Sequence, residues 1–440
     1  MNRIQHHFHE KNKLSLAVVI VVCFAVATED TVFATPIESE EPKTEAALEQ
    51  TEPFDGTLTG DWGGVRSTLL EYGISIDIAN TGDLLVNSRG VSSDVRYANL
   101  LETSLTADME KLVGLSGGTV YIMALGTHGK DPGEATGSIT APSNLAANDT
   151  FKLFEAWYEQ SLFNDRIGFL VGLFAVDSEF DAKETADVFI NGAFGTGLDL
   201  SETGINGPSI FPVSSIGLRL RANITDEITL RAAVLDGVPG DPGNHKGTQI
   251  GLNDGDGLLI VDELNYQPSA FDFLRFGLGS WLYTTEFDDL VDTAPDGDPV
   301  ARDGTYGIYS FVEGKILSES DAADQGLSGF LRIGGADEDV NQIQMFYGAG
   351  LVYTGLIPRR DNDVLGLGVT VGVNGNKFMT AQNNAGQSVK NAEIALELTY
   401  RAQLMPWLSF QPVLQYYINP GTDPTLDDSI VGGFRYNINF

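Results

Sequence analysis

Arginine and glutamate side chains recur at alternate positions within segments whose other positions are mostly apolar. In "SIGLRLRANI" Arg219 and Arg221 alternate with leucine, and in "AEIALELTYRAQL" Glu393, Glu397 and Arg401 share one parity. A guanidinium group offers a planar fork of hydrogen-bond donors, and a carboxylate offers acceptors. Held on one surface, these groups can hydrogen-bond a polar solute without breaking any of its bonds.

The remaining residues do not indicate a catalytic site. Covalent or acid–base catalysis needs a nucleophile beside a base, or a carboxylate arranged with a histidine. Only His128 and His245 follow the first ten residues, and both lie in predicted loops without such a partner motif. We therefore expect no metal, no cofactor and no enzyme. The alternative from a different functional class is an enzyme, such as a barrel lipase or protease.

After residue 74 the chain reads as strands separated by turns. Alternating apolar and polar residues recur in segments near the length of about 9–11 residues that a tilted strand needs to cross a bilayer. The predicted strands are 74–86, 96–109, 117–127, 151–163, 167–176, 213–224, 226–236, 256–267, 271–286, 304–317, 326–336, 343–354, 363–374, 389–405, 407–419 and 430–440. The sequence therefore predicts an all-β fold, a transmembrane antiparallel β-barrel of about 16 strands.

The connections between these strands are sorted by length. Long, acidic connections alternate with short ones, which is the pattern of outer-membrane barrels. The long ones are 128–150, 177–212, 237–255, 287–303 and 375–388, and the short ones are 164–166, 225, 268–270 and 406. Three connections break the pattern, namely the short 337–342 and the longer 318–325 and 355–362. The longest loop, 177–212, contains the apolar, glycine-rich "VFINGAFGTGLDL" and is expected to fold inward and narrow a pore.

Parity predicts which face of the strands meets water. An arginine on the lipid face at mid-membrane costs about 2–4 kcal/mol, so a whole set there would exceed a typical folding free energy of about 5–15 kcal/mol. The arginines in question share the polar parity of their strands: Arg219, Arg221, Arg231, Arg275, Arg332, Arg401 and Arg435. They are expected to face a water-filled lumen. The alternative, a soluble two-sided β-protein, does not explain the sorted loops.

The end of the sequence favours a closed barrel as well. The last residues, "FRYNINF", alternate without a break up to Phe440. Pairing of the last strand with the first would leave no open edge. Phe440 would then lie in an aromatic girdle, and an ending of this kind is similar to the segment that outer-membrane assembly machinery recognises.

The first 73 residues are organised differently. Residues 1–34 read as a signal peptide, with an apolar run at Leu14–Ala27 and possible cleavage after Ala27 or Ala34. An acidic, proline-broken spacer is expected at 35–55. A short helical segment is expected at 56–73, with Asp61 as N-cap and Gly73 at the C-cap, and the barrel at 74–440. The formal net charge of −35 argues against nucleic-acid binding.

Three segments resemble the carbohydrate-selective porin family usually named for OprB. They are "LTGDWGGVRSTLLEYGI", "KLFEAWYEQSLFNDRIGFLVGLFAVDSEF" and "ELTYRAQLMPWLSFQPVLQYYINPG". The resemblance implies a 16-stranded barrel that carries sugars passively across the outer membrane of a Gram-negative bacterium, with the N-terminal helical segment at the periplasmic mouth. Small sugars, outer-membrane lipid and lipopolysaccharide, and the assembly machinery acting on Phe440 are the expected partners. Monomer and homotrimer are both open.

A sugar-conducting lumen needs several weak hydrogen bonds along its wall. The candidates share the lumen parity, and the two tryptophans among them could stack on the apolar face of a sugar ring. They are Arg219, Arg221, Arg231, Arg275, Arg332, Arg401, Glu102, Glu155, Glu159, Glu393, Glu397, Trp157 and Trp281. For each charge the alternative is a lumen residue balanced by a cross-strand partner, and for each tryptophan a packing role. The alternative function is a general diffusion porin for small hydrophilic solutes or ions, without sugar preference.

Overall fold

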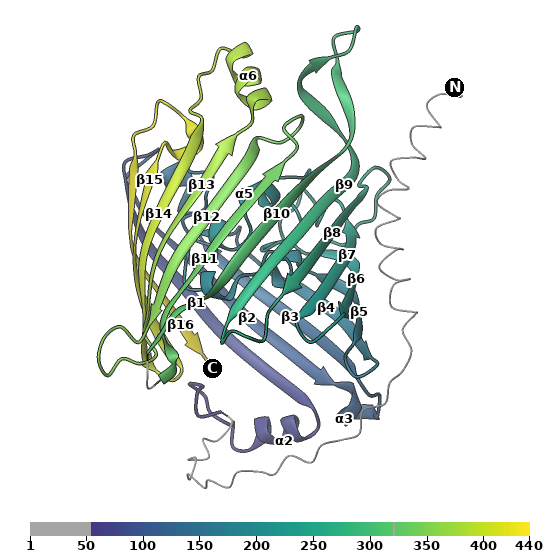
Figure 1. Cartoon of the computed structure of the whole chain (residues 1–440), viewed down its shortest axis with the longest axis vertical. Coiled ribbons are helices and arrows are strands. Elements are labelled where there is room, and N and C mark those ends of the chain that lie inside the picture. Colours follow the sequence, from purple (N-terminus) through teal and green to yellow (C-terminus); the bar gives the residue numbers. More distant parts are fainter. Residues whose placement is uncertain (1–53, 320–321) are drawn as a thin grey trace. The chain divides into compact units, whose positions relative to one another are not determined.

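The described part of the chain is a closed antiparallel β-barrel of 16 strands (Figure 1). The computed structural model describes residues 54–319 and 322–440, so the predicted signal peptide and nearly all of the spacer lie outside the described residues. Each strand pairs with its sequence neighbours, and β1 closes the barrel on β16 from Ala79↔Asn439 to Ser88↔Ile430. None of the described helices is long and apolar enough to cross a membrane.

The strands are β1 (Ile74–Ser88), β2 (Asp94–Asp108), β3 (Gly118–Gly129), β4 (Thr150–Leu162), β5 (Ile167–Phe174), β6 (Ser215–Asn223), β7 (Ile228–Asp236), β8 (Leu258–Tyr266), β9 (Leu274–Thr293), β10 (Pro299–Glu319), β11 (Ala322–Ala336), β12 (Ile343–Thr354), β13 (Val364–Asn374), β14 (Ala392–Met405), β15 (Leu408–Ile418) and β16 (Ser429–Asn439). The helices are α2 (Val65–Glu71), α3 (Met109–Val113), α4 (Gly133–Thr136), α5 (Leu198–Ser201) and α6 (Asn376–Asn384), with 3-10 turns η1 (Val176–Ser178), η2 (Glu184–Ala186), η3 (Gly192–Phe194) and η4 (Pro420–Thr422).

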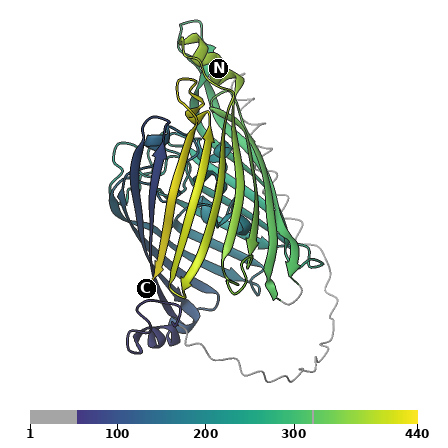
Figure 2. The ribbon, with the colours of Figure 1, turned by 90° about the vertical axis from the view of Figure 1, so that its left-hand side faces the viewer.

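All the predicted strands are present, and the main differences lie in β9, β10 and β11. Pairing between β9 and β10 continues to Pro299↔Thr293, so the predicted loop 287–303 is mostly a long hairpin with a connection of only 294–298. Likewise β10 and β11 extend until only 320–321 separates them. The prediction that 318–325 is a longer connection breaking the pattern was therefore wrong. Figure 2 shows the long strands on the green side of the barrel rising above the others.

The connections confirm the sorting by length. We call the end of the barrel where β1 begins and β16 ends the short-turn end, and the opposite end the long-loop end. The long-loop end carries 130–149, 175–214, 237–257 and 375–391, whereas the short-turn end has connections such as 163–166 and 224–227. The connections 355–363 and 109–117 are long exceptions at the short-turn end, and 89–93, 294–298 and 337–342 are short exceptions at the long-loop end.

Strand parity also agrees with the prediction. In β14, Glu393 and Glu397 are buried inside the barrel, whereas Leu396 and Leu398 are exposed on its outer surface. The predicted arginines lie on the inner side as well. Most of them contact the connection 175–214, Arg221 shares Glu159 with Arg219, and Arg435 contacts Asn144 of the connection 130–149. Most outward-facing side chains of the described strands are apolar, as a barrel wall in hydrocarbon requires. An exception is Asp262 of β8, which has the outward parity and accepts a hydrogen bond from Ser280 at 2.5 Å.

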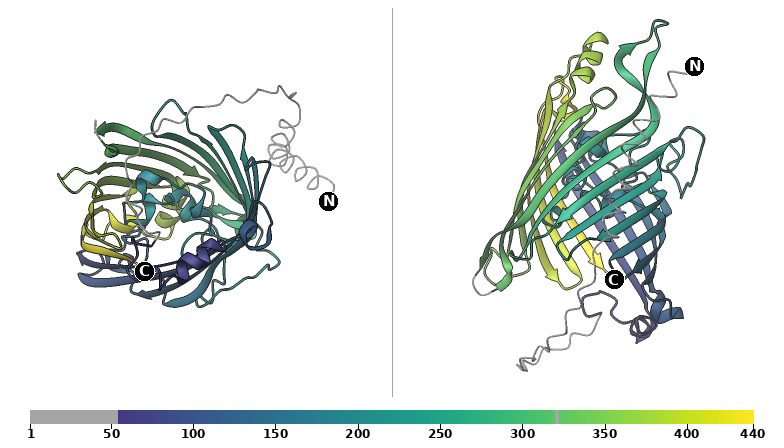
Figure 3. Two further views of the ribbon diagram at one scale, coloured as in Figure 1. Left: turned by 90° about the horizontal axis from the view of Figure 1, so that it is seen from below. Right: turned by 45° about the vertical axis from the view of Figure 1, so that its right-hand side comes forward.

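The connection 175–214, here called the constriction loop, folds into the barrel as predicted (Figure 3, left). Its Phe189 and Phe194 stack with ring centroids 4.3 Å apart. They lie against Gly366 and Gly368 of β13, where any added Cβ would come within 3.1 Å of a phenylalanine ring atom. The glycines of this inner wall therefore provide the room in which the loop packs.

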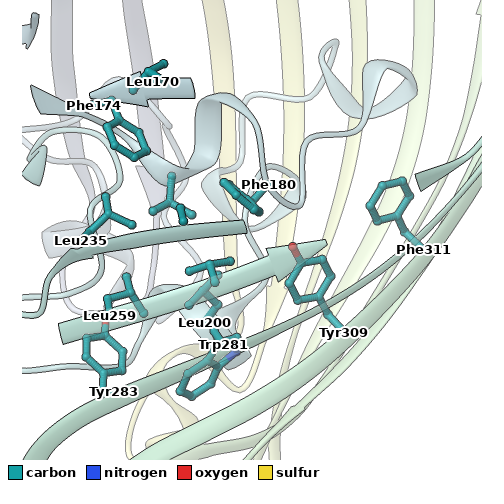
Figure 4. Close-up of a cluster of buried hydrophobic side chains, with 13 residues drawn as sticks. Leu170, Phe174, Phe180, Leu200, Leu235, Leu259, Trp281, Tyr283, Tyr309 and Phe311 are labelled. Carbon is teal, nitrogen blue, oxygen red and sulfur yellow. The ribbon is translucent and has the colours of Figure 1, made fainter. Parts of the chain in front are cut away.

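A second apolar cluster joins the constriction loop to the neighbouring part of the wall, β5 and β7–β10. Phe180 and Leu200 of the loop pack against Trp281, Tyr283 and other wall residues (Figure 4). The inner side chains of β7–β10 in this region are thus large and apolar where the loop covers them. The loop is consequently packed against a continuous stretch of the inner wall that includes β7–β13.

The N-terminal segment differs from the prediction in detail. Helix α2 begins at Val65 with Gly64 as N-cap (φ 96°), and Asp61 instead accepts the backbone N–H of Ser67 at 2.7 Å. Val65 is 51% exposed and Tyr72, just after the helix, 63% exposed, whereas Arg66 is the buried residue of this helix. Gly73, with φ 86°, follows the helix end as expected of a terminating glycine.

Arg66 lies where the first and last strands meet. Its guanidinium donates to the carbonyl oxygens of Phe440 at 2.9 Å and Ile76 at 2.8 Å, and lies 4.4 Å from the ring centroid of Phe54 and 4.9 Å from that of Trp62. β1 runs beyond the end of β16, so ladder bonds are missing there. The side chain of Arg66 bridges the two strands at this place, which explains the "DWGGVR" motif better than helix formation does.

Candidate functional site

A polar cavity of about 760 Å³ remains in the lumen beside the constriction loop. Inner side chains of β1–β4 and β14–β16 line it on the wall, and loop residues close the remaining side. The lining residues are Thr81, Leu100, Glu102, Tyr121, Met123, Asn144, Leu145, Phe154, Glu155, Ala175, Asp177, Ser178, Asp187, Phe211, Asn362, Arg401, Gln403, Ser409, Gln411, Arg435 and Asn437. The cavity therefore offers donors, acceptors and some apolar surface to the same solute.

Three of the predicted site residues line this cavity: Glu102, Glu155 and Arg401. Arg401 reaches from β14 to Asp187 of the constriction loop, with 3.2 Å between Nη1 and Oδ2. Both side chains stay open to water, at 35% and 76% exposure. This ion pair is a bridge between wall and loop that a solute in the cavity can touch.

The two predicted glutamates of β14, Glu393 and Glu397, hold loops in place. Glu397 accepts the backbone N–H groups of Ile190 and Asn191 at 2.8 and 2.9 Å. Glu393 accepts those of Ile139 and Thr140, both at 2.8 Å. A loop buried in a barrel must satisfy its peptide N–H groups without water, and charge-assisted acceptors are the strongest available. Because both side chains are at most 1% exposed, they are anchors and do not reach a solute.

Arg332 and Arg275 are committed to the constriction loop in the same way. Arg332 of β11 is bound to two loop carboxylates, with Nη2 2.9 Å from Asp181 and Nη1 against Asp199. Arg275 of β9 donates through Nε to Glu313 at 2.9 Å and through Nη2 to the carbonyl of Ala182. These two guanidinium groups therefore fix the loop against β9–β11 and lie away from the cavity.

Arg219, Arg221 and Arg231 form a ladder with the glutamates between them. Arg219 lies between Glu159 at 3.0 Å and Glu179 at 2.6 Å, and its side chain is only 4% exposed. Arg221 shares Glu159 at 3.2 Å, and the Nε of Arg231 lies 3.4 Å from Glu179. Each charge is thus balanced by a neighbour, and the ladder is placed beyond the cavity lining.

The two tryptophans have different surroundings. Trp157 is half-buried in β4, stacks on Tyr121 with ring centroids 5.0 Å apart, and donates its indole N–H to Glu155 at 3.1 Å. Trp281 is 1% exposed and packs within the cluster of Figure 4. The ring of Trp281 is covered by the constriction loop in this structure and does not line the cavity.

Comparison with known proteins agrees with this architecture. Residues 92–440 match the family "Carbohydrate-selective porin, OprB family". The chain belongs to this family. Porin B of Pseudomonas aeruginosa is 26% identical over 427 residues, which cover 88% of this chain and 92% of that protein. Porin AaxA of Chlamydia pneumoniae is 22% identical over 71% of this chain and 64% of its own length.

Solved structures show the same fold. The high-pH structure of Pseudomonas putida OprB superposes with a TM-score of 0.79 at 21% identity, covering 88% of this chain and 99% of that one. The outer membrane channel DcaP of Acinetobacter baumannii gives 0.53 at 9% identity, covering 83% and 97%. This member of the OprB family is accordingly a passive, carbohydrate-selective channel of the Gram-negative outer membrane, and not an enzyme.

In this porin several residues that line the cavity were not among the predicted site residues. The connection 130–149, expected only as an acidic outer loop, also enters the lumen, where Asn144 donates its backbone N–H to Ile190 at 2.8 Å. Asn144 and the constriction-loop residues Asp177 and Asp187 then line the cavity. The only sequence signal for Asp177 and Asp187 was their position in the loop that was expected to fold inward.

Asp177 is the cavity residue with the most unusual titration. Burial raises its pKa to about 6, the nearby Glu155 carboxylate adds to this rise, and a backbone hydrogen bond from Phe211 opposes it. The Phe211 N–H lies 3.4 Å from Oδ2. The group therefore changes charge in the range of mildly acidic water.

Proposed function

We propose that the 760 Å³ cavity is the constriction through which sugars pass, and that Glu102, Glu155, Arg401 and Arg435 contact them. The supporting observation is that this cavity collects donors and acceptors in one place, with Glu102, Arg401 and Arg435 not fully buried, whereas the other predicted charges bind loops or one another. Asp187 and Asn144 join this set from the two inward loops. Sugar hydroxyls donate and accept at once, so both kinds of group are needed in one passage.

The chemistry of passage is repeated exchange of weak hydrogen bonds. A sugar leaves water only if the wall replaces part of its hydration, and it continues only if no single site holds it tightly. Arg401 offers donors, Glu102 offers acceptors, and the half-buried ring of Tyr121 lines the same cavity. Trp157 supports Tyr121 from behind through the stacked pair. Arg219, Arg332, Glu393 and Glu397 keep the walls and loops in place.

The matching test is transport by the protein in liposomes. Glucose should enter the liposomes faster than amino acids of equal size. In a separate measurement of the ion current through the channel, Arg401→Gln should weaken the block of that current by sugar while the barrel still folds. Arg89→Gln is the control, because Arg89 is exposed at the long-loop end. Equal entry of glucose and amino acids would indicate a general diffusion porin. Unchanged block in the Arg401 variant would remove this residue from the constriction.

We also propose that the short-turn end, with α2, faces the periplasm, and that Phe440 with the alternating residues of β16 is the segment that outer-membrane assembly machinery recognises. The support is the arrangement of turns and loops, which follows that of outer-membrane barrels. Phe440→Ala should lower the amount of folded porin in outer membranes, with Phe163→Ala at an exposed turn as control. Equal amounts of both variants would contradict the role.

A further inference from the structure

Asp262 places a carboxylate on the outer surface of the barrel, away from the lumen. It lies in the middle of β8, where Ile260 and Leu264 are the outward residues before and after it. Ser280 of β9 donates its hydroxyl to Oδ1 of Asp262 at 2.5 Å. Within the described part of the chain no other donor, and no lysine or arginine, binds this carboxylate. Hydrocarbon supplies no hydrogen-bond donor, so the second oxygen of Asp262 can still accept a hydrogen bond from a partner.

A group of hydrogen-bond donors lies elsewhere on the outer surface, across β16, β1 and β2. Tyr97 of β2 and Tyr436 of β16 have the outward parity, and their hydroxyl oxygens are 2.9 Å apart. Asn99 donates its side-chain amide to the Tyr436 hydroxyl at 3.3 Å. Two hydroxyl groups carry two hydrogens, and the contact between them uses one. The other hydrogen has no acceptor among the residues that the structure describes, so it is available to a partner as well.

The wall around both groups is shaped for close approach. The ring of Tyr436 lies over Gly82 of β1, where an added Cβ would come within 2.6 Å of it. The ring is thereby held against the wall, with its hydroxyl in a fixed place. Across the strands Asp262 has Ala232 and Ser280 as direct neighbours. Because both neighbours are small, a phenol ring from outside can reach the carboxylate.

The donor and the acceptor lie at a similar depth but on opposite sides of the barrel. Asp262 is four residues from the end of β8 at Tyr266, and Tyr436 is three residues from the end of β16 at Asn439. Both strands end at the short-turn end. In the ring of 16 strands, β8 and β16 are eight positions apart. The two groups therefore cannot meet within one barrel, whereas they can meet when a second copy lies beside the first.

We propose that copies of this porin associate side by side in the outer membrane, with the β8–β9 face of one copy against the β16–β1–β2 face of the next. In this contact the free hydroxyl hydrogen of the Tyr97–Tyr436 pair is donated to Asp262 of the neighbouring copy. Because the two faces are opposite, the contact is heterologous and does not close into a ring, so it extends into a row. The proposal concerns the outer surface and is independent of the sugar path.

Cysteine cross-linking in reconstituted membranes tests the contact, since the only native cysteine, Cys23, lies in the predicted signal peptide. Leu264→Cys introduces a thiol beside Asp262, and Leu84→Cys introduces one opposite Tyr97 in the next strand. With a short bismaleimide, the double variant should give a ladder of dimers, trimers and longer rows. A mixture of the two single variants should give mixed dimers only, and each single variant alone should stay monomeric.

Leu84→Cys combined with Leu351→Cys is the matched control. Leu351 is an exposed outward leucine of β12, which is four strands from β8 and four strands from β16. Cross-linking in this pair measures random collisions only, and no ladder is expected. A ladder as strong as that of the first pair, no ladder in either pair, cross-linking of a single variant alone, or a ladder that stops at trimers would overturn the proposal.

The hydrogen bond itself is tested in the same double-cysteine chain. Asp262→Leu should lower the yield of cross-linked rows by roughly 5-fold, the order expected for one lost hydrogen bond. Tyr97→Phe together with Tyr436→Phe should have the same effect. Unchanged sugar entry into liposomes would show that each variant is folded. Full ladders in the folded variants would refute the assigned contact, and if one of them fails to fold, the other decides the outcome.

Discussion

At the scale of single residues, carboxylates of one parity serve two different purposes. Glu397 is buried beneath the constriction loop and binds two of its N–H groups, whereas Glu102 lines the open cavity. Their side chains and strand parity are equivalent, and only the path of the loop above them differs. A lumen-facing charge is therefore a solute contact only where no loop covers it.

Asp177 makes the charge of the cavity depend on pH. Its raised pKa of about 6 means that it is ionised at pH 7 and mostly protonated at pH 5. The ratio of K⁺ to Cl⁻ permeability through the channel should consequently fall as the pH is lowered through this range, because the lining loses a negative charge. Glu155 is the charged group that faces it. The K⁺/Cl⁻ ratio measured between pH 7 and pH 5 checks this, and Asp177→Asn should flatten the curve. An identical pH profile in that variant would assign the effect elsewhere.

At the scale of elements, the inner wall and the loop are shaped for one another. A Cβ on Gly368 would lie 2.6 Å from the ring of Phe194 and 2.9 Å from that of Phe189, and these two rings stack with their centroids 4.3 Å apart. The glycines of β13 at this place, Gly366 and Gly368, leave the space that the two aromatic rings occupy. The loop position is therefore set by shape as well as by ion pairs.

Gly368→Ala should destabilise the seated loop by about 1–3 kcal/mol, the usual cost of overpacking. Hydrogen exchange of the backbone N–H groups at 188–194 is the measurement, and faster exchange is expected. Gly432→Ala is the matched control, because a Cβ there meets nothing closer than 3.7 Å. Equal exchange in the two variants would show that the ring can shift freely.

Glu397→Ala should also loosen the constriction loop, for an electrostatic reason. The change leaves the N–H groups of Ile190 and Asn191 without their acceptor, at about 1–3 kcal/mol each when buried. Larger fluctuations of the single-channel current are expected. Glu134→Ala, at a side chain 68% exposed, should leave the current steady. A quiet channel in both variants would mean that another group replaces the carboxylate.

At the scale of the whole molecule, the barrel depends on one seam where distant parts of the chain meet. β1 and β16 pair over Ala79–Ser88 and Ile430–Asn439. Below this ladder Arg66 bridges Ile76 and Phe440, and Leu58 donates its N–H to Asn439 at 2.8 Å. The N-terminal segment thus completes the closure of the barrel and, from its position, does not enter the cavity lining.

Arg66→Ala should weaken the seam selectively. Two partly buried carbonyl oxygens lose a charged donor, and hydrogen bonds to charged groups contribute about 1.5–3 kcal/mol each. The folded barrel should convert to the unfolded form at lower temperature in detergent, with faster hydrogen exchange in β1 and β16 than in β12. Arg359→Ala in the 355–363 connection is the control. Unaltered exchange at the seam would contradict the bridging role.

The sequence alone determined the number of strands, the parity of each strand and the loop that enters the lumen. These are local properties: alternation has a period of two residues, lipid excludes guanidinium groups, and an apolar loop such as 188–200 needs a buried position. Only the tertiary structure decided which lumen charges a solute can reach. Glu397, Arg332 and Trp281 have the right parity but lie beneath a loop, and Asn144 lines the cavity because a second loop turns inward. Such contacts join residues far apart along the chain, so no local pattern records them.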